Sequence, residues 1–232
     1  MDATLSQARR MGTPRAIALC QCFDGALEFQ AGEWDRAEKV LRESIHVYSE
    51  IGAASGEAIA RQRLGLVLTA KGKLEEAKAM LQEGAAVAER AIMRAHCLTR
   101  VYATLTHNRL VAGDLEGADQ ALGLGLSMSE RHGSCSTCDA LLLPVAVSVH
   151  IAQGDLEQAE IYFERLEAAA HEYGSQMWMA MAEQSRAELM TAQGNIEEAL
   201  LCYEHARQGF IEAGNHYEVL RCEAALERIR AE

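Results

Sequence analysis

The sequence predicts an all-α protein: a right-handed superhelical solenoid of about five antiparallel helix hairpins, followed by a C-terminal capping helix. Three observations support this fold class. A pattern of small and apolar residues repeats every 40 or 41 residues, apolar residues within each repeat follow helical steps of three and four, and Ala, Leu and Glu dominate the composition.

The repeat is marked by a glycine that recurs at intervals of 40 or 41 residues. These glycines are Gly32, Gly72, Gly113, Gly154 and Gly194. Five residues after each glycine stands an alanine, and four residues further stands a large apolar residue, as with Ala77 and Leu81. A second glycine follows the first by twenty residues, although the second repeat has Ile92 there. Each repeat is therefore two helices of nearly equal length.

The predicted boundaries follow from these markers. The whole chain, 1–232, is expected to be one solenoid domain. Its repeats cover about 15–52, 53–92, 93–133, 134–174 and 175–214, and the capping helix covers 215–231. The first glycine of each repeat ends one helix in the left-handed conformation. Asp114, Asp155 and Asn195, which come next, are expected to cap the following helix.

Composition limits the function. A net charge of −12 and the lack of a basic stripe argue against contact with nucleic acid. The longest apolar run, 140–149, is shorter than the roughly 20 residues of a membrane span, so no membrane contact is expected. The N-terminus has no apolar signal-peptide core, and seven cysteines without such a signal fit the cytoplasm.

Catalytic motifs are missing from the sequence. It contains no Gly-x4-Gly-Lys-Ser/Thr phosphate loop, no His-Glu-x-x-His zinc motif and no Gly-x-Ser-x-Gly nucleophile elbow. The sequence therefore predicts a protein that is not an enzyme and that needs no cofactor.

The segments 113–118 and 154–159 share the pattern Gly-Asp-Leu-Glu-x-Ala, which resembles the tetratricopeptide repeat. The small residue that this family places seven positions before the turn glycine is matched by Gly25, Gly65 and Ala187. The family's repeat is about 34 residues long. Longer repeats of the present kind resemble the tetratricopeptide-like region of large bacterial transcription activators of the MalT type. That resemblance implies a sensor or regulatory region, or a stand-alone relative.

The resemblance also implies a binding surface, because in this family the first helix of each hairpin lines a concave groove. Transferred from the turn glycine, the groove positions are Cys22, Phe29, Gln62, Leu66, Thr69, Arg100, His107, Leu110, Ser148, Gln184, Glu188 and Thr191. The apolar members Phe29, Leu66 and Leu110 suit packing between repeats equally well. The polar members are the stronger candidates for contact with a partner.

Cys135-Ser136-Thr137-Cys138 is the one local motif that suggests metal or redox chemistry. His132 and Cys97 are the further residues that would complete such a site. A structural zinc ion normally needs four ligands, and the sequence has no second Cys-x-x-Cys, so plain free thiols remain the alternative. Pro144 lies nearby and predicts either a late start or a kink in the following helix.

Taken together, these features predict a scaffold that binds a protein or peptide in its groove, within or beside a transcription regulator. Two alternatives stay open at this point. One is a domain that senses a small-molecule effector, and the other is a thiol- or metal-dependent switch at Cys135 and Cys138. Self-association into a homo-oligomer through the edges of the array is compatible with each of them.

Overall fold

The computed structural model describes residues 6–8, 10, 12–133 and 135–231. The other positions of the predicted domain, 1–5, 9, 11, 134 and 232, lie outside the described residues. Helices of 15 to 18 residues succeed one another from Pro14 onward, and the described ranges contain no strand. The chain divides into two compact units, 1–133 and 134–232. This division coincides with the predicted junction between the third and fourth repeats.

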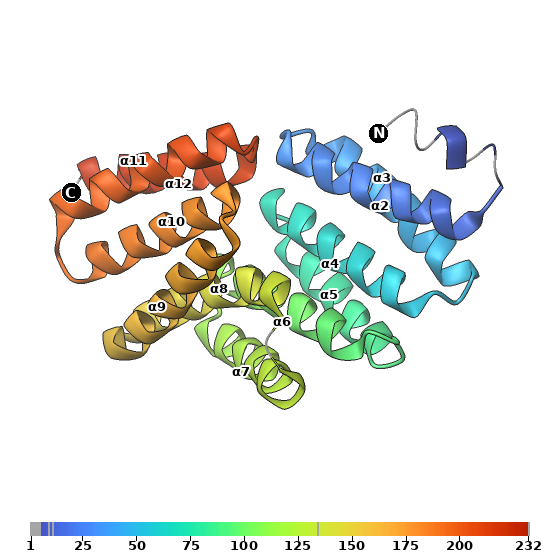
Figure 1. The fold of residues 1–232 in the computed structure, drawn as a ribbon, viewed down its shortest axis with the longest axis horizontal. Helices are drawn as coiled ribbons and strands as arrows, with labels where there is room; N and C mark the ends of the chain where they lie inside the picture. Colours follow the sequence, from blue (N-terminus) through green and yellow to red (C-terminus); the bar gives the residue numbers. More distant parts are fainter. Residues whose placement is uncertain (1–5, 9, 11, 134, 232) are drawn as a thin grey trace. The chain divides into compact units, whose positions relative to one another are not determined.

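The first unit contains three helix pairs (Figure 1). They are α2 (Pro14–Gln30) with α3 (Trp34–Glu50), α4 (Ala54–Ala70) with α5 (Leu74–Ala88), and α6 (Arg94–Val111) with α7 (Leu115–His132). The helices of each pair pack together, and α4 also packs against α2 and α6. The first helices of the three pairs therefore lie side by side, as the sequence predicts.

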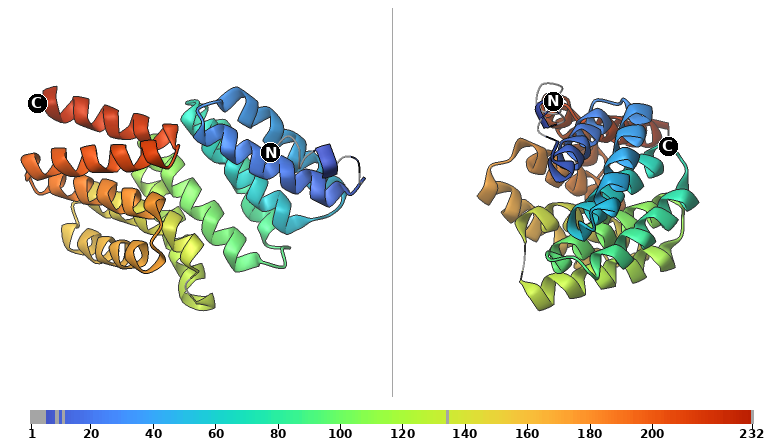
Figure 2. Two further views of the ribbon diagram at one scale, coloured as in Figure 1. Left: turned by 45° about the horizontal axis from the view of Figure 1, so that its top comes forward. Right: turned by 90° about the vertical axis from the view of Figure 1, so that its right-hand side faces the viewer.

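The second unit contains two further pairs and one last helix (Figure 2). They are α8 (Ser136–Gln153) with α9 (Leu156–Tyr173), α10 (Gln176–Ala192) with α11 (Ile196–Glu212), and α12 (His216–Ala231). Here α10 packs against both α8 and α11, while α12 packs against α11. The five predicted hairpins and the capping helix are thus confirmed.

The small residues of the repeat allow the two helices of a hairpin to approach closely. The alanines five positions after the turn glycines have no exposed surface, and they are Ala37, Ala77, Ala118, Ala159 and Ala199. Across the second hairpin, the Cβ that an alanine would add at Gly65 would lie 2.5 Å from Cγ of Leu81. A larger residue at position 65 would therefore push α4 away from α5.

The helix ends follow the predicted chemistry with one exception. Gly154 ends α8 with a φ of 77°, the left-handed conformation that glycine adopts without strain. The side chains of Asp114 and Asp155 accept hydrogen bonds from the backbone N–H groups of Gly117 and Gln158, as N-caps do. The prediction that the Asn195 side chain caps α11 is wrong. Its side chain accepts no hydrogen bond from α11, and its amide nitrogen donates to Gln193 at the end of the preceding helix.

Pro144 lies inside α8, which is helical from Ser136 to Gln153, so the predicted late start of this helix is wrong. Among the described residues, α8 is also the one helix long and apolar enough to cross a membrane by length and composition. A core helix of a soluble protein meets the same criterion. Ala146, Val147 and Val149 of α8 have no exposed surface in the protein.

Candidate binding site in the first unit

One face of α2 exposes large apolar side chains. Leu19, Phe23 and Leu27 are spaced by four residues, so they lie on the same face of the helix. Their exposed fractions are 48%, 50% and 50%. We call these three residues the α2 stripe. A contiguous apolar surface of this kind marks an interaction site on a soluble protein more often than a single exposed side chain does.

The stripe leads into a cavity of about 390 Å³ between α2, α4 and the loops that precede α4 and α6. We call this cavity the α2–α4 basin. Its apolar lining comes from Leu19, Phe23, Ile59, Ile92 and Met93. Ile92 is 99% exposed and stands where the other repeats have their second glycine. The irregular residue of the second repeat is therefore part of the basin.

Tyr48 forms one side of the α2–α4 basin, and its close packing against the start of α4 requires a glycine at position 56. A Cβ added at Gly56 would lie 2.4 Å from the ring of Tyr48, so only a residue without a side chain lets the start of α4 approach that ring so closely. Burial raises the pKa of the Tyr48 phenol to about 12, although Arg63 and Arg15 act in the opposite direction. Tyr48 is therefore uncharged at neutral pH and can offer a hydrogen bond to a ligand.

Three arginines, Arg15, Arg63 and Arg90, also line the basin. Arg63 is held in place because its Nη1 donates to the carbonyl oxygen of Cys22 at 2.8 Å and contacts the Cys22 sulfur at 3.2 Å. Its guanidinium also lies 4.7 Å from the centre of the Phe23 ring, a cation–π contact. Burial raises the pKa of the Cys22 thiol, so Cys22 brings no negative charge to Arg63.

The structure places the predicted groove residues of the first unit at buried and half-buried positions. Phe29, Gln62, Thr69 and His107 are buried, like Cys22, while Leu66, Arg100 and Leu110 are half-buried.

Two of these polar residues form hydrogen bonds between repeats. Gln62 donates to the Thr104 hydroxyl at 2.7 Å, and the Thr69 hydroxyl accepts from Asn108 at 3.0 Å. Both bonds join α4 to α6, so Gln62 and Thr69 fix the packing of neighbouring repeats.

The predicted residues of the second unit form part of a polar cluster. The Ser148 hydroxyl donates to the Glu188 carboxylate at 2.6 Å, and Arg221 lies 3.6 Å from the other oxygen of that carboxylate. Burial raises the pKa of Glu188 despite this arginine. Thr191 is half-buried and bonds to the carbonyl of Ala187, and Gln184 is buried. Arg221 comes from α12, a contribution that the repeat pattern did not reveal.

The residues that form the basin lie close in sequence to those predicted. Phe23 and Arg63 each follow a predicted groove position, Cys22 and Gln62, by one residue. One residue turns a helix by about 100°, which moves the side chain from the interior to the surface. The spacing of the α2 stripe and the replacement of the second glycine by Ile92 were the sequence signals that could have revealed this site.

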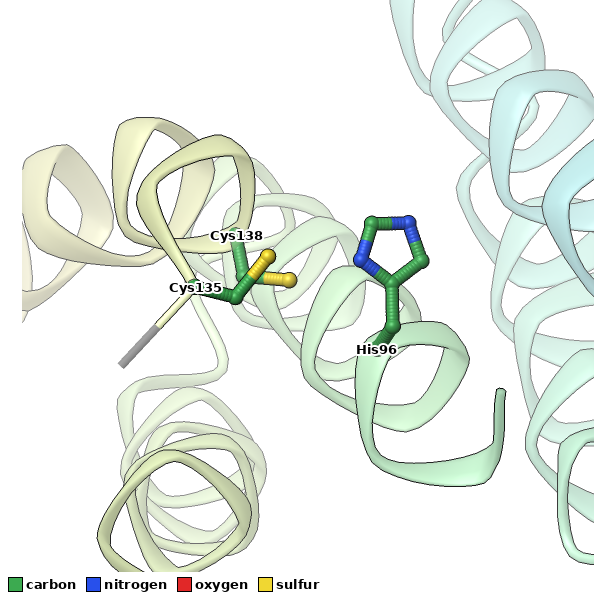
Figure 3. Close-up of side chains that lie close together, drawn as sticks. All are labelled: His96, Cys135 and Cys138. Atoms are coloured by element: carbon green, nitrogen blue, oxygen red, sulfur yellow. The ribbon is translucent and has the colours of Figure 1, made fainter. Parts of the chain in front are cut away.

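All seven cysteines are described, and none of them forms a disulfide. Cys97 is fully buried in the core of the first unit, where burial raises its pKa to about 11, and His132 is exposed at the end of α7. Cys135 precedes α8 and Cys138 lies in its first turn (Figure 3). Their sulfur atoms lie within 4.8 Å of each other. As a pair they supply two of the four ligands that a structural zinc ion normally has.

The repeated helix pairs place this protein in the helical-repeat class, whose fold is consistent with a protein-interaction scaffold. The sequence matches the family described as the MalT-like TPR region over residues 15–231. The chain therefore belongs to the MalT-like TPR family.

Similar solved structures share this fold. The crystal structure of BtubC (BKLC) from P. vanneervenii is 18% identical with a TM-score of 0.55, and the match covers 88% of this chain and 91% of that one. The Rap protein complexed with Competence and Sporulation Factor is 12% identical with a TM-score of 0.61, covering 94% and 63%. A putative kinesin light chain from Podosopora anserina is 16% identical with a TM-score of 0.54, covering 87% and 98%. No curated protein matches the sequence.

Proposed function

We propose that this chain is a non-catalytic cytoplasmic scaffold that binds a segment of a partner protein along the α2 stripe, as a regulatory module. The observation that carries this proposal is the exposure of Leu19, Phe23 and Leu27 on one face of α2. Covering half-exposed apolar side chains of this size with a partner's apolar residues contributes roughly 25 cal/mol for each Å² removed from water.

Two further findings support a regulatory scaffold. The family is named for the repeat region of MalT, and a protein of similar fold, Rap, has been crystallised in complex with Competence and Sporulation Factor. A net charge of −12 also disfavours nucleic acid as the partner.

Site-specific photo-crosslinking tests the proposal. A photo-reactive amino acid placed at position 27 is expected to capture one protein reproducibly in cells of the source organism, because Leu27 belongs to the stripe but does not line the basin. The matched control is position 201 in α11, since Leu201 is 62% exposed and lies in the second unit. Capture of the same proteins from both positions would contradict the proposal. A crosslink only to another copy of the chain would assign the stripe to self-association instead.

A thiol switch at Cys135 and Cys138 is the second candidate function. Burial acts to raise the pKa of the Cys135 thiol, but hydrogen bonds with Thr137 and Cys138 outweigh it and lower the pKa. A lowered pKa increases the fraction of the reactive thiolate. In the proposed step, the two thiols lose two protons and two electrons to form a disulfide, and hydrogen peroxide takes these up to become two waters.

We therefore expect peroxide to join Cys135 to Cys138 faster than it oxidises Cys97, whose thiol is fully buried. Peptide mapping by mass spectrometry, with the free thiols blocked at successive times, measures the two rates. The Cys138→Ser variant is the control, because it retains Cys135 but has no thiol beside it to complete the disulfide. Equal rates for the pair and for Cys97 would count against the switch.

A further inference from the structure

The α2–α4 basin combines an apolar interior with a concentration of positive charge. Of the described residues that line it, three are arginines and none is acidic. The chain as a whole has 34 acidic residues against 22 Lys and Arg. Such a grouping of arginines against the overall charge favours an anion as the ligand, because the three positive charges attract an anion and no acidic residue among the described residues of the lining repels it.

The arginines are also available to a ligand. Among the described residues that line the basin, none is a carboxylate that could pair with Arg15, Arg63 or Arg90. Arg63 uses Nη1 to bond Cys22, and its other N–H groups have no hydrogen-bond partner among the described residues. A guanidinium held on one side with free N–H groups on the other is suited to a carboxylate, which accepts two parallel hydrogen bonds.

The size of the basin favours a small molecule. Its volume of about 390 Å³ falls within the range of pockets that enclose small ligands, roughly 300–1,000 Å³. Phe23, Ile59 and Met93 supply apolar surface for the body of that ligand. An inorganic anion would leave this surface in water, and an uncharged apolar molecule would leave the arginines without a counter-charge.

We infer that the α2–α4 basin binds a small organic carboxylate with an apolar aliphatic or aromatic body. The carboxylate accepts hydrogen bonds from Arg63 and Arg90, and the apolar body lies against Phe23 and Ile59. This site does not depend on the partner protein proposed above. It would give the module an effector site that shares Leu19 and Phe23 with the α2 stripe and leaves Leu27 outside.

Calorimetric titration of the purified full chain with phenylbutyrate tests the inference. Phenylbutanamide has the same body without the charge, and acetate has the charge without the body. We expect phenylbutyrate to bind at least about tenfold more tightly than either, because a charge-assisted hydrogen bond and a buried ring each contribute more than about 1.4 kcal/mol. Equal affinities for phenylbutyrate and its amide, or no binding of phenylbutyrate, would overturn the inference.

Single variants locate the site. Arg90→Gln is expected to weaken phenylbutyrate binding by about tenfold, since it removes one charged donor from an exposed position without disturbing the core. Arg131→Gln is the matched control, because Arg131 is exposed on α7 of the same unit and does not line the basin. Equal losses in both variants would mean general electrostatic attraction and would overturn the assignment.

Titrations with inorganic phosphate and with a short peptide distinguish the small carboxylate from other ligands of the basin. A titration of the Leu27→Glu variant separates this test from the test of the proposed function. If inorganic phosphate binds as tightly as phenylbutyrate, or if a short peptide ending in phenylalanine binds at least tenfold more tightly, the small carboxylate is not the ligand. Leu27→Glu should leave phenylbutyrate binding unchanged, because Leu27 does not line the basin. Its effect on partner binding is therefore independent of the test of the basin.

Discussion

Replacing Phe210 by alanine is expected to destabilise the second unit by about 3–5 kcal/mol, the range measured for large-to-small substitutions of buried phenylalanine. Phe210 has no exposed surface and belongs to a cluster with Tyr203, Cys222 and Leu226. These residues join α11 to α12, so the cavity would remove packing on which the last helix depends. A helical repeat touches only its neighbours, and the loss cannot be shared with distant helices.

Urea denaturation measures this change in the second unit alone. The chain has two tryptophans, Trp34 in the first unit and Trp178 in the second, so a Trp34→Phe background leaves Trp178 as the fluorescent reporter. Leu201→Ala is the control, because Leu201 is 62% exposed on the same helix and its replacement should change the free energy of unfolding by less than about 0.5 kcal/mol. Similar shifts in both variants would mean that Phe210 is not in a packed core.

Replacing Gly65 by alanine is expected to destabilise the first unit by about 1–3 kcal/mol, whereas the same change at Gly123 is expected to stabilise it by up to about 1 kcal/mol. Both glycines lie inside helices, where alanine is the better helix former. A Cβ at position 65 would lie 2.5 Å from Leu81, which is fully buried, but a Cβ at position 123 would meet no atom within 4 Å. The packing around the glycine therefore decides whether the change to alanine stabilises or destabilises the first unit.

The measurement uses a Trp178→Phe background, in which Trp34 reports on the first unit. The midpoint of urea unfolding should fall for Gly65→Ala and rise for Gly123→Ala. If both variants were stabilised, α4 and α5 would not approach as closely at Gly65 as the structure shows.

The helix pairs were predictable because their signals are local. A glycine at a helix end and an alanine at a helix crossing each follow from the backbone geometry of a few residues. Capping is less regular than these two signals. Asp114 and Asn195 occupy equivalent positions, but of the two only Asp114 accepts a hydrogen bond from the backbone of its helix.

The binding surface was less predictable because it depends on packing between segments far apart in sequence. Gln62 was expected to face a partner, but it is buried because Thr104 of the next repeat lies opposite it. The arginines of the basin come from three segments, and only the folded chain brings Arg15, Arg63 and Arg90 to one cavity. A transfer of positions from shorter repeats could not identify this grouping.

The affinity of the purified chain for the protein captured at position 27 tests the central claim most directly. Leu27→Glu places a carboxylate in the α2 stripe and is expected to weaken binding by at least about tenfold, because a partner's apolar side chains could cover the stripe only by removing water from that charge. Leu201→Glu, a similar change at an exposed site of the second unit, should leave the affinity unchanged. Equal affinities of wild type and Leu27→Glu would contradict the account.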